Sequence, residues 1–315
     1  MAIATTQQIT NYYDSYSDKE VIFSREILHT LRVAPREIYI KCGGNQWPCI
    51  INSTSFKAAK IILGTKGGAF AVITQKNAPP VSLRFCFFID KGTETMSFFI
   101  AGKVTNVAPY TDSKELSVVT LTYTQRPPDD FIVKIGALIE ANINFVKRRE
   151  DRIVMTSEAR HRLGIEKEDT IIYVQNVPRK CILRDLSFSG AKVVLLGVPK
   201  FVSGKETVLR IIFDDPPETL DIRGSIIHAD FAEGRQDIVT ASIKFDEEAV
   251  PAAYKLHIND YLTMTKKNLL DTSPKTQSAA TQTLEQAAAA MKARLAAAAR
   301  SGTSVQNISN AMSGK

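Results

Sequence analysis

Several features that would assign a chemistry are scarce in this chain of 315 residues, which has four cysteines, four histidines and one tryptophan. The cysteines (Cys42, Cys49, Cys86 and Cys181) show no CxxC spacing. We therefore expect reduced core residues rather than a zinc site or a disulfide framework. No apolar run approaches the roughly 20 residues that cross a bilayer. The N-terminus lacks the basic and apolar regions of a signal peptide, so we expect a cytoplasmic protein with no membrane association.

Catalytic motifs are missing as well. The sequence contains no HExxH, Walker A or GxGxxG pattern, and its four histidines stand far apart. The glycine-rich segment GTKGGA (64–69) lies between expected strands, so a hairpin turn is predicted there rather than a phosphate cradle. We assign no catalytic residue, metal or cofactor and expect a protein that is not an enzyme.

The net charge of +7 is unevenly distributed along the chain. From Lys266 onward there are seven Lys or Arg and two Asp or Glu, which leaves only +2 on residues 1–265. The bulk charge therefore does not predict nucleic-acid binding, and only a local cluster could support it.

Two segments of the chain repeat one another. PCIINSTSFKAAKIIL (48–63) and KCILRDLSFSGAKVVL (180–195) share Cys-Ile, Ser-Phe and Ala-Lys before an apolar run. The offset is constant, since Cys181 follows Cys49 at the same distance along the chain as Ser187 follows Ser55. Further matches follow in the same order, as far as ELSVVTLTY (115–123) and DIVTASIKF (237–245). We infer two copies of one fold, duplicated and diverged.

Short runs rich in Ile, Val, Phe and Thr alternate with turn clusters in both copies, which is typical of antiparallel barrels or sandwiches. Apolar residues at helical spacing predict a closing helix for each copy, at 129–143 and 246–263. The prediction is a mainly β protein of two tandem barrels, each closed by a helix. The expected strands are 38–41, 48–52, 59–63, 69–74, 81–89, 96–107 and 115–123, then 153–156, 169–176, 180–184, 191–195, 206–213, 220–229 and 237–245.

Helices are expected near both ends of the chain. The segment 1–30 predicts an amphipathic helix with Ile22, Phe23, Ile27 and Leu28 buried. A linker, SPKTQSAATQT, precedes an alanine-rich stretch (283–302) that predicts a loosely attached or partly formed helix. The predicted parts are an N-terminal domain with a helical extension (1–143), an interdomain linker (144–152), a C-terminal domain (153–265) and a flexible or partly helical tail (266–315).

Residues that could hold a ligand gather at two places. KRREDR (147–152) packs four basic side chains into six positions, with Arg148 and Arg152 at RxxxR spacing. Further along, Asp185, Ser187 and Gly190 stand at the spacing D-x-S-x-x-G. Taken singly, the first motif is typical of a solvated charged patch and the second of an ordinary turn.

Together, in this order on a strand-rich domain, the two motifs resemble those of the PilZ family of cyclic di-GMP receptors. The resemblance covers roughly 145–263. It implies that the RxxxR segment is a flexible loop at the N-terminal edge of a barrel, that the D/NxSxxG motif faces it, and that the ligand is cyclic di-GMP. The residues so implied are Arg148, Arg152, Asp185, Ser187 and Gly190, with Lys147 and Arg149 as secondary contacts.

These residue types suit that ligand, which carries two phosphates and two guanines. An arginine fork pairs with a phosphate, grips the O6/N7 edge of guanine or stacks on its ring. A carboxylate such as Asp185 only accepts, which matches the N–H donors of the guanine Watson–Crick edge. The Ser187 hydroxyl can donate or accept, and Gly190 lets the backbone turn tightly and the ligand approach closely.

The first copy departs from the pattern. Ser53, Ser55 and Ala58 stand at the aligned positions, so the acidic acceptor and the glycine are absent. Arg32 and Arg36 have RxxxR spacing, but Arg36 stands much closer in the sequence to Ser53 than Arg152 does to Asp185. That shorter gap leaves no room for the intervening strand. We expect a degenerate copy that does not bind the nucleotide, an arrangement similar to the two-domain PilZ receptors of spirochaetes.

Three functions are compatible with these residues. In the first, cations at 147–152 repel one another without ligand and the segment is mobile; binding orders it, changes the interdomain arrangement and exposes a surface to a protein partner in motility or signalling. The second is nucleic-acid binding by the cluster and the basic tail. The third is a structural duplicate with a relict site. We expect the first, in a monomer.

Overall fold

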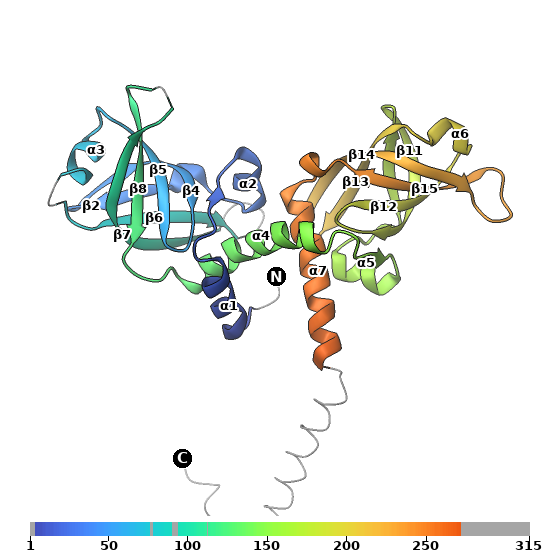
Figure 1. Ribbon diagram of the computed structural model, residues 1–315, viewed down its shortest axis with the longest axis horizontal. Helices are drawn as coiled ribbons and strands as arrows, with labels where there is room; N and C mark the ends of the chain where they lie inside the picture. Colours follow the sequence, from blue (N-terminus) through green and yellow to red (C-terminus); the bar gives the residue numbers. More distant parts are fainter. Residues whose placement is uncertain (1–3, 76–77, 90–93, 112, 272–315) are drawn as a thin grey trace, which may run out of the picture. The chain divides into compact units, whose positions relative to one another are not determined.

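Figure 1 shows a computed structural model of the protein, which describes residues 4–75, 78–89, 94–111 and 113–271. The chain separates into two compact units, Met1–Asp260 and Tyr261–Lys315. Both β-sheets belong to the first unit. Among the described residues, no helix is long and apolar enough to cross a membrane.

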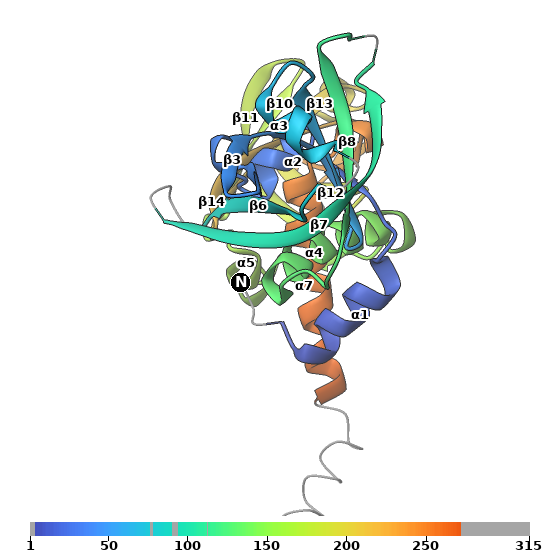
Figure 2. The same cartoon turned by 90° about the vertical axis from the view of Figure 1, so that its left-hand side faces the viewer.

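The first sheet has eight strands in the order β1-β4-β5-β8-β7-β6-β2-β3. Its described pairings are antiparallel, and the long strand β7 curves strongly (Figure 2). The strands are β1 (Val21–Ile22), β2 (Tyr39–Cys42), β3 (Asn45–Pro48), β4 (Ile50–Thr54), β5 (Ala58–Gly64), β6 (Val81–Phe88), β7 (Thr95–Pro109) and β8 (Leu116–Tyr123).

The second sheet has the order β10-β13-β14-β15-β12-β11-β9, and β10 also pairs with β11. That extra pairing closes the strands from β10 to β11 into an antiparallel barrel. The strands are β9 (Ile153–Val154), β10 (Asp169–Val174), β11 (Val177–Leu186), β12 (Gly190–Leu196), β13 (Glu206–Asp214), β14 (Pro217–Phe231) and β15 (Ile238–Phe245). The predicted fold class, mainly β with tandem barrel-like copies, is confirmed.

Helices surround these strands. Side chains of Thr5, Ser24 and Thr156 accept hydrogen bonds from backbone N–H groups and so cap α1, α2 and α5. The helices are α1 (Thr6–Tyr16), α2 (Arg25–Thr30), α3 (Gly68–Ile73), α4 (Asp129–Lys147), α5 (Ser157–Leu163), α6 (Pro199–Val202) and α7 (Ala252–Asp271), with 3-10 turns η1 (Pro35–Glu37) and η2 (Glu247–Ala249).

The duplication extends beyond the segments that revealed it. Ile22 of β1 pairs with Ser53 of β4, and Val154 of β9 pairs with Asp185 of β11. The two pairs are related by the constant offset of the repeat. A register irregularity lies just before Ser53 and recurs just before Asp185. Both copies therefore include the short strand that leads into the barrel.

One strand of the second barrel is split in the first copy. β11 is continuous, whereas β3 and β4 are interrupted at Cys49. Pro48 has no N–H for the ladder, and the Cys49 N–H bonds the Ile38 carbonyl at 3.3 Å. β3 and β4 correspond to the two halves of β11, so the strand order is otherwise the same.

The core of the first copy is aromatic. The rings of Phe85 and Phe131 lie 4.8 Å apart between centroids, and α4 buries Phe131 against the sheet. On another face of α4, a Cβ at Gly136 would lie 2.5 Å from Tyr12 Cδ2, so glycine lets α1 approach closely. The Tyr12 hydroxyl donates to Glu140 at 2.9 Å, and burial raises the pKa of Tyr12.

The strand predicted at 69–74 is wrong, because this segment forms helix α3. Ala69 and Ile73, four positions apart, are its buried residues. A short apolar run fits either period, and tertiary contacts decide between them. The preceding GTKGGA (64–69) therefore leads into a helix rather than closing a hairpin.

The N-terminal helix is divided. α1 and α2 flank β1, which contains Ile22. Ile22 was predicted to be buried but is 67% exposed, whereas Phe23 is buried as predicted. The strand predicted at 153–156 ends at Val154 and is followed by α5. The predicted tail helix, 283–302, lies outside the described residues.

Candidate ligand-binding site

The segment Arg148–Arg152 connects α4 to β9. Arg148 is the C-cap of α4, and its N–H donates to the Asn144 carbonyl at 2.8 Å. Lys147 is the last residue of α4 and is exposed. Directly after Arg152, β9 pairs with β11 at Asp185. The helix and the sheet therefore hold the segment at both ends.

The two sequence motifs meet in one ion pair. Arg152 Nη1 lies 2.5 Å from Asp185 Oδ1. Asp185 stands on β11 directly after the register irregularity, and its side chain is 15% exposed. The structure thus brings together Arg152 and Asp185, which are 33 residues apart in the sequence.

The other two arginines also have carboxylate partners. Arg148 Nε donates to Asp151 Oδ2 at 2.8 Å. Arg149 Nη2 donates to Glu247 Oε1 at the start of η2. This hydrogen bond lowers the pKa of the Glu247 carboxyl, with a smaller contribution from the Arg149 charge.

Charge repulsion in the cluster is therefore offset within the protein. The sequence suggested cations that repel one another without ligand, but the structure pairs Arg148, Arg149 and Arg152 each with a carboxylate. The segment is further tied to the barrel by Ser189, whose hydroxyl donates to Glu150 Oε1 at 3.1 Å. Motif spacing identified Asp185 but did not reveal the roles of Glu247, Glu150 and Asp151, although the last two lie between the motif arginines.

Ser187 shapes the turn of its motif. The Gly190 N–H donates to the Ser187 hydroxyl at 3.1 Å, and the Ser187 N–H donates to the Gly190 carbonyl at 2.8 Å. The buried Tyr254 hydroxyl donates to the Ser187 carbonyl at 2.7 Å. Ser187 is fully buried, so its observed contacts stabilise the turn after Asp185. A direct contact of Ser187 with a ligand stays a prediction.

Gly190 is required by strand packing. A Cβ at this position would lie 2.2 Å from the backbone oxygen of Ile243, on the neighbouring strand β15. Any side chain would force β12 and β15 apart. The sequence related this glycine to a tight turn and to ligand approach, because the close contact between strands is not visible in one strand's sequence.

Phe188, inside the motif, connects the turn to α4. It is fully buried, and its ring meets Phe145 edge to face with centroids 6.0 Å apart. In the first copy Phe56 stacks on Tyr13 of α1 at the same centroid distance, 6.0 Å. This second pair is related to the first by the offset of the repeat. The phenylalanine of the repeated Ser-Phe therefore packs against a helix in both copies, a contact that the sequence did not predict.

The first copy also has a polar contact between the aligned segment and its barrel. The offset that relates Ser53 to Asp185 also relates Glu20 to Arg152. Glu20 accepts a hydrogen bond from the Ser53 hydroxyl and lies 2.8 Å from Lys60 Nζ. The counterpart of the arginine segment is therefore 16–20, with the same spacing to the motif.

This correspondence corrects the comparison made from the sequence. Arg32 follows the end of α2, and Arg36 lies in η1. They do not occupy the position of the arginine segment, and β2 and β3 do fit between Arg36 and Ser53. Ser55 keeps the turn, because its hydroxyl accepts from the Ala58 N–H at 3.1 Å.

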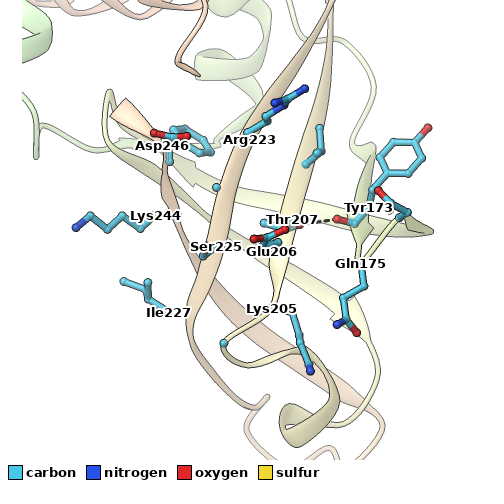
Figure 3. Close-up of a pocket in the computed structure, with 15 residues that line it drawn as sticks. Tyr173, Gln175, Lys205, Glu206, Thr207, Arg223, Ser225, Ile227, Lys244 and Asp246 are labelled. Carbon is cyan, nitrogen blue, oxygen red and sulfur yellow. Dashed lines mark hydrogen bonds between the residues drawn. The ribbon is translucent and has the colours of Figure 1, made fainter. Parts of the chain in front are cut away.

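A groove of about 930 Å³ adjoins the motif on the second barrel. Lys244 contributes to it and is the strand neighbour of Gly190 on one side and of Ser225 on the other. Figure 3 shows long polar side chains of both signs around this groove. Its charged lining residues are Lys205, Glu206, Arg223, Lys244 and Asp246.

Metal ligands do not gather anywhere in the described part of the chain: no group of three or more His, Cys, Asp or Glu there could hold a metal ion. The four cysteines are buried, as expected of core residues. Burial raises the pKa of the Cys49 thiol to about 12, which makes it a poor nucleophile or metal ligand at neutral pH.

Comparisons with known proteins cover most of the chain. Residues 7–142 match the PilZN3 domain, and residues 147–263 match the PilZ domain. A protein of Treponema denticola described as a cyclic di-GMP binding protein is 41% identical over 272 residues, 86% of each chain.

Two solved structures are also similar. The Borreliella burgdorferi PlzA protein in complex with c-di-GMP is 22% identical, with 81% of this chain and 98% of that chain covered and a TM-score of 0.37. YcgR of Escherichia coli in complex with c-di-GMP is 13% identical, with 78% and 92% covered and a TM-score of 0.26.

Proposed function

The chain belongs to the PilZ family, as a two-domain PilZN3–PilZ protein of the spirochaete type, and we propose that it is a non-enzymatic receptor for cyclic di-GMP. The observation that supports this most strongly is the contact of Arg152 with Asp185, because it unites the cationic and the acceptor motif at one place. The Treponema denticola relative is described as a cyclic di-GMP binding protein, which supports the same ligand.

The proposed binding mode follows from the chemistry of these groups. Arg148 and Arg152 bind a phosphate or the O6/N7 edge of a guanine, and Asp185 accepts from the guanine N–H groups. Gly190 supports the site indirectly, because it lets β12 and β15 approach closely beside the turn that follows Asp185. Lys147 and Arg149 contribute secondary charge. The Arg152–Asp185 pair opens or rearranges when the ligand takes its place.

The same segment is proposed to carry the output. Residues 144–152 join the proposed domains 1–143 and 153–265, ahead of the tail 266–315. Ligand binding at Arg148 and Arg152 therefore changes the interdomain arrangement. We propose that a protein partner in motility or signalling recognises the changed arrangement.

Titration calorimetry with cyclic di-GMP tests the proposal. Hydrogen bonds to charged groups contribute about 1.5–3 kcal/mol each, so Arg148→Ala/Arg152→Ala is expected to weaken binding at least about 100-fold. Arg162→Ala is the matched control, since Arg162 pairs with Glu158 on α5 and lies outside the motif. Equal binding by the wild type and the double variant, or binding by neither, would reject the proposed function.

Nucleic-acid binding has less support. Residues 1–265 carry a net charge of only +2, so this part of the chain attracts a phosphate backbone weakly. The basic tail lies outside the described residues. A salt-dependent gel shift that survives Asp185→Ala would favour this alternative.

A further inference from the structure

Two carboxylates that are not defining positions of the RxxxR or D-x-S-x-x-G pattern pair with arginines of the ligand segment. Asp151 pairs with Arg148, and Glu247 pairs with Arg149. Asp151 is a local partner, three positions away in the same segment. Glu247 comes from a different part of the domain, 98 residues away. It is the more informative of the two.

Glu247 is held in place independently of the arginine segment. It is the first residue of η2, and only Asp246 separates it from the end of β15. The Asp246 N–H bonds the Arg223 carbonyl at 3.0 Å, and the Ala249 N–H bonds the Asp246 carbonyl at 3.0 Å. The carboxylate is therefore positioned by the end of a barrel strand and by a hydrogen-bonded turn, and Arg149 donates to it.

The pair is accessible to water. The Glu247 side chain is 49% exposed and that of Arg149 is 32% exposed. Arg149 lowers the pKa of Glu247, so the carboxylate is ionised at neutral pH. An exposed pair of this kind is weak enough to exchange for another anion, and a phosphate offers arginine a similar bidentate partner.

The degenerate copy lacks this charge. Ala58 pairs with Thr122, as Gly190 pairs with Lys244, so residue 125 of the first copy aligns with Glu247. That residue is Gln125, which is neutral. The carboxylate is thus present in the copy that carries arginines and absent from the copy that lacks them.

We propose that Glu247 is a built-in competitor for the ligand: it occupies Arg149 in the free protein and must be displaced by a phosphate of cyclic di-GMP. This rests on the proposed function. Glu247 sets the affinity in two ways, because it withholds Arg149 and places a negative charge beside a dianionic ligand.

The test is titration of the full chain with cyclic di-GMP. Glu247→Gln keeps the shape and removes the charge, so binding should tighten about threefold to tenfold. Glu248→Gln is the matched control: the same charge is removed one residue away at another exposed site, and affinity should change less than twofold. Glu247→Ala should shift affinity in the same direction as Glu247→Gln.

A double-variant cycle isolates the contact. In an Arg149→Ala background, Glu247→Gln should tighten binding less than in the wild-type background, because no arginine is left to release and only the charge repulsion is relieved. An equal gain in the two backgrounds, an equal gain from Glu248→Gln, or no gain in the wild-type background would each overturn the inference.

Failure of the proposed function has a different signature. If the wild type does not bind cyclic di-GMP, the proposed function fails and the competitor role fails with it. If the wild type binds and Arg148→Ala/Arg152→Ala does not, but Glu247→Gln leaves affinity unchanged, only the competitor role is rejected.

Discussion

In both copies a segment after a helix contacts the barrel, but its contacting residue is a cation in one copy and an anion in the other. In the second copy the segment after α4 supplies the guanidinium of Arg152 and the barrel supplies Asp185. In the first copy the segment after α1 supplies the carboxylate of Glu20, and the barrel supplies Ser53 and Lys60. Closing this segment onto the barrel is therefore a property of the fold, whereas the charge that the segment contributes differs between the copies.

A second polar contact joins the segment to the barrel in both copies. Asp18 pairs with Lys57 at 2.8 Å in the first copy. Glu150 and Ser189 occupy the aligned positions in the second copy and are joined by a hydrogen bond of 3.1 Å. The segment contributes a carboxylate in both copies. This contact anchors the segment in each copy, whereas the neighbouring bridge at Arg152 distinguishes them.

The largest effect is expected at the motif glycine, where the copies differ in packing. Gly190→Ala places a Cβ 2.2 Å from the Ile243 oxygen, and overpacking of this kind costs about 1–3 kcal/mol. Ala58→Gly, at the aligned position, should cost about 0.5–1 kcal/mol through backbone entropy. Urea unfolding monitored by circular dichroism measures both. Equal losses would mean that strand approach does not explain the glycine.

The next largest effect, on ligand affinity, is expected at Asp185, the acidic acceptor that the first copy lacks. Asp185→Ser installs the residue of the first copy, so the barrel should keep its fold. Cyclic di-GMP binding should weaken about tenfold to 100-fold, since the guanine N–H groups lose an ionised acceptor. Calorimetry gives the affinity, and circular dichroism controls for folding. Unchanged affinity would contradict the role proposed for Asp185.

The smallest effect is a change in titration at Glu247. Arg149 lowers the pKa of this carboxyl through its hydrogen bond, so Arg149→Ala should raise the pKa toward the ordinary value of about 4.3. The sign follows from a depressed folded-state pKa: the contact contributes above the unfolded value and is lost as pH falls through the folded one. Carboxyl carbon shifts in an NMR titration report it, with Glu248 as the internal control. No change at Glu247 would show that the pair is not formed in solution.

Much of the fold could be predicted from local patterns. The spacing of short β-branched and aromatic runs predicted most strands, and the repeat of 48–63 at 180–195 predicted two copies. The prediction of a strand at 69–74 was wrong, because a short apolar run is compatible with either a strand or a helix. The constant offset of the repeat also failed to reveal the segment 16–20, because its chemistry differs from that of Arg148–Arg152 while its place in the fold is the same.

Only part of the candidate site could be predicted from the sequence. Motif spacing identified Arg152 and Asp185, which the structure brings together. It did not identify Glu247 or Tyr254, because their relation to the motif depends on where β15 and α7 return to the barrel. Those contacts join residues far apart in the chain, and no short pattern encodes them.

The sequence by itself determined which copy carries arginines and an acidic acceptor, since residue type and spacing are written directly in the chain. Only the tertiary structure decided that each arginine already has a carboxylate partner and that Gly190 is required by a neighbouring strand. The physical reason is that charge pairing and close packing depend on distances across the sheet, which strand register and curvature set together.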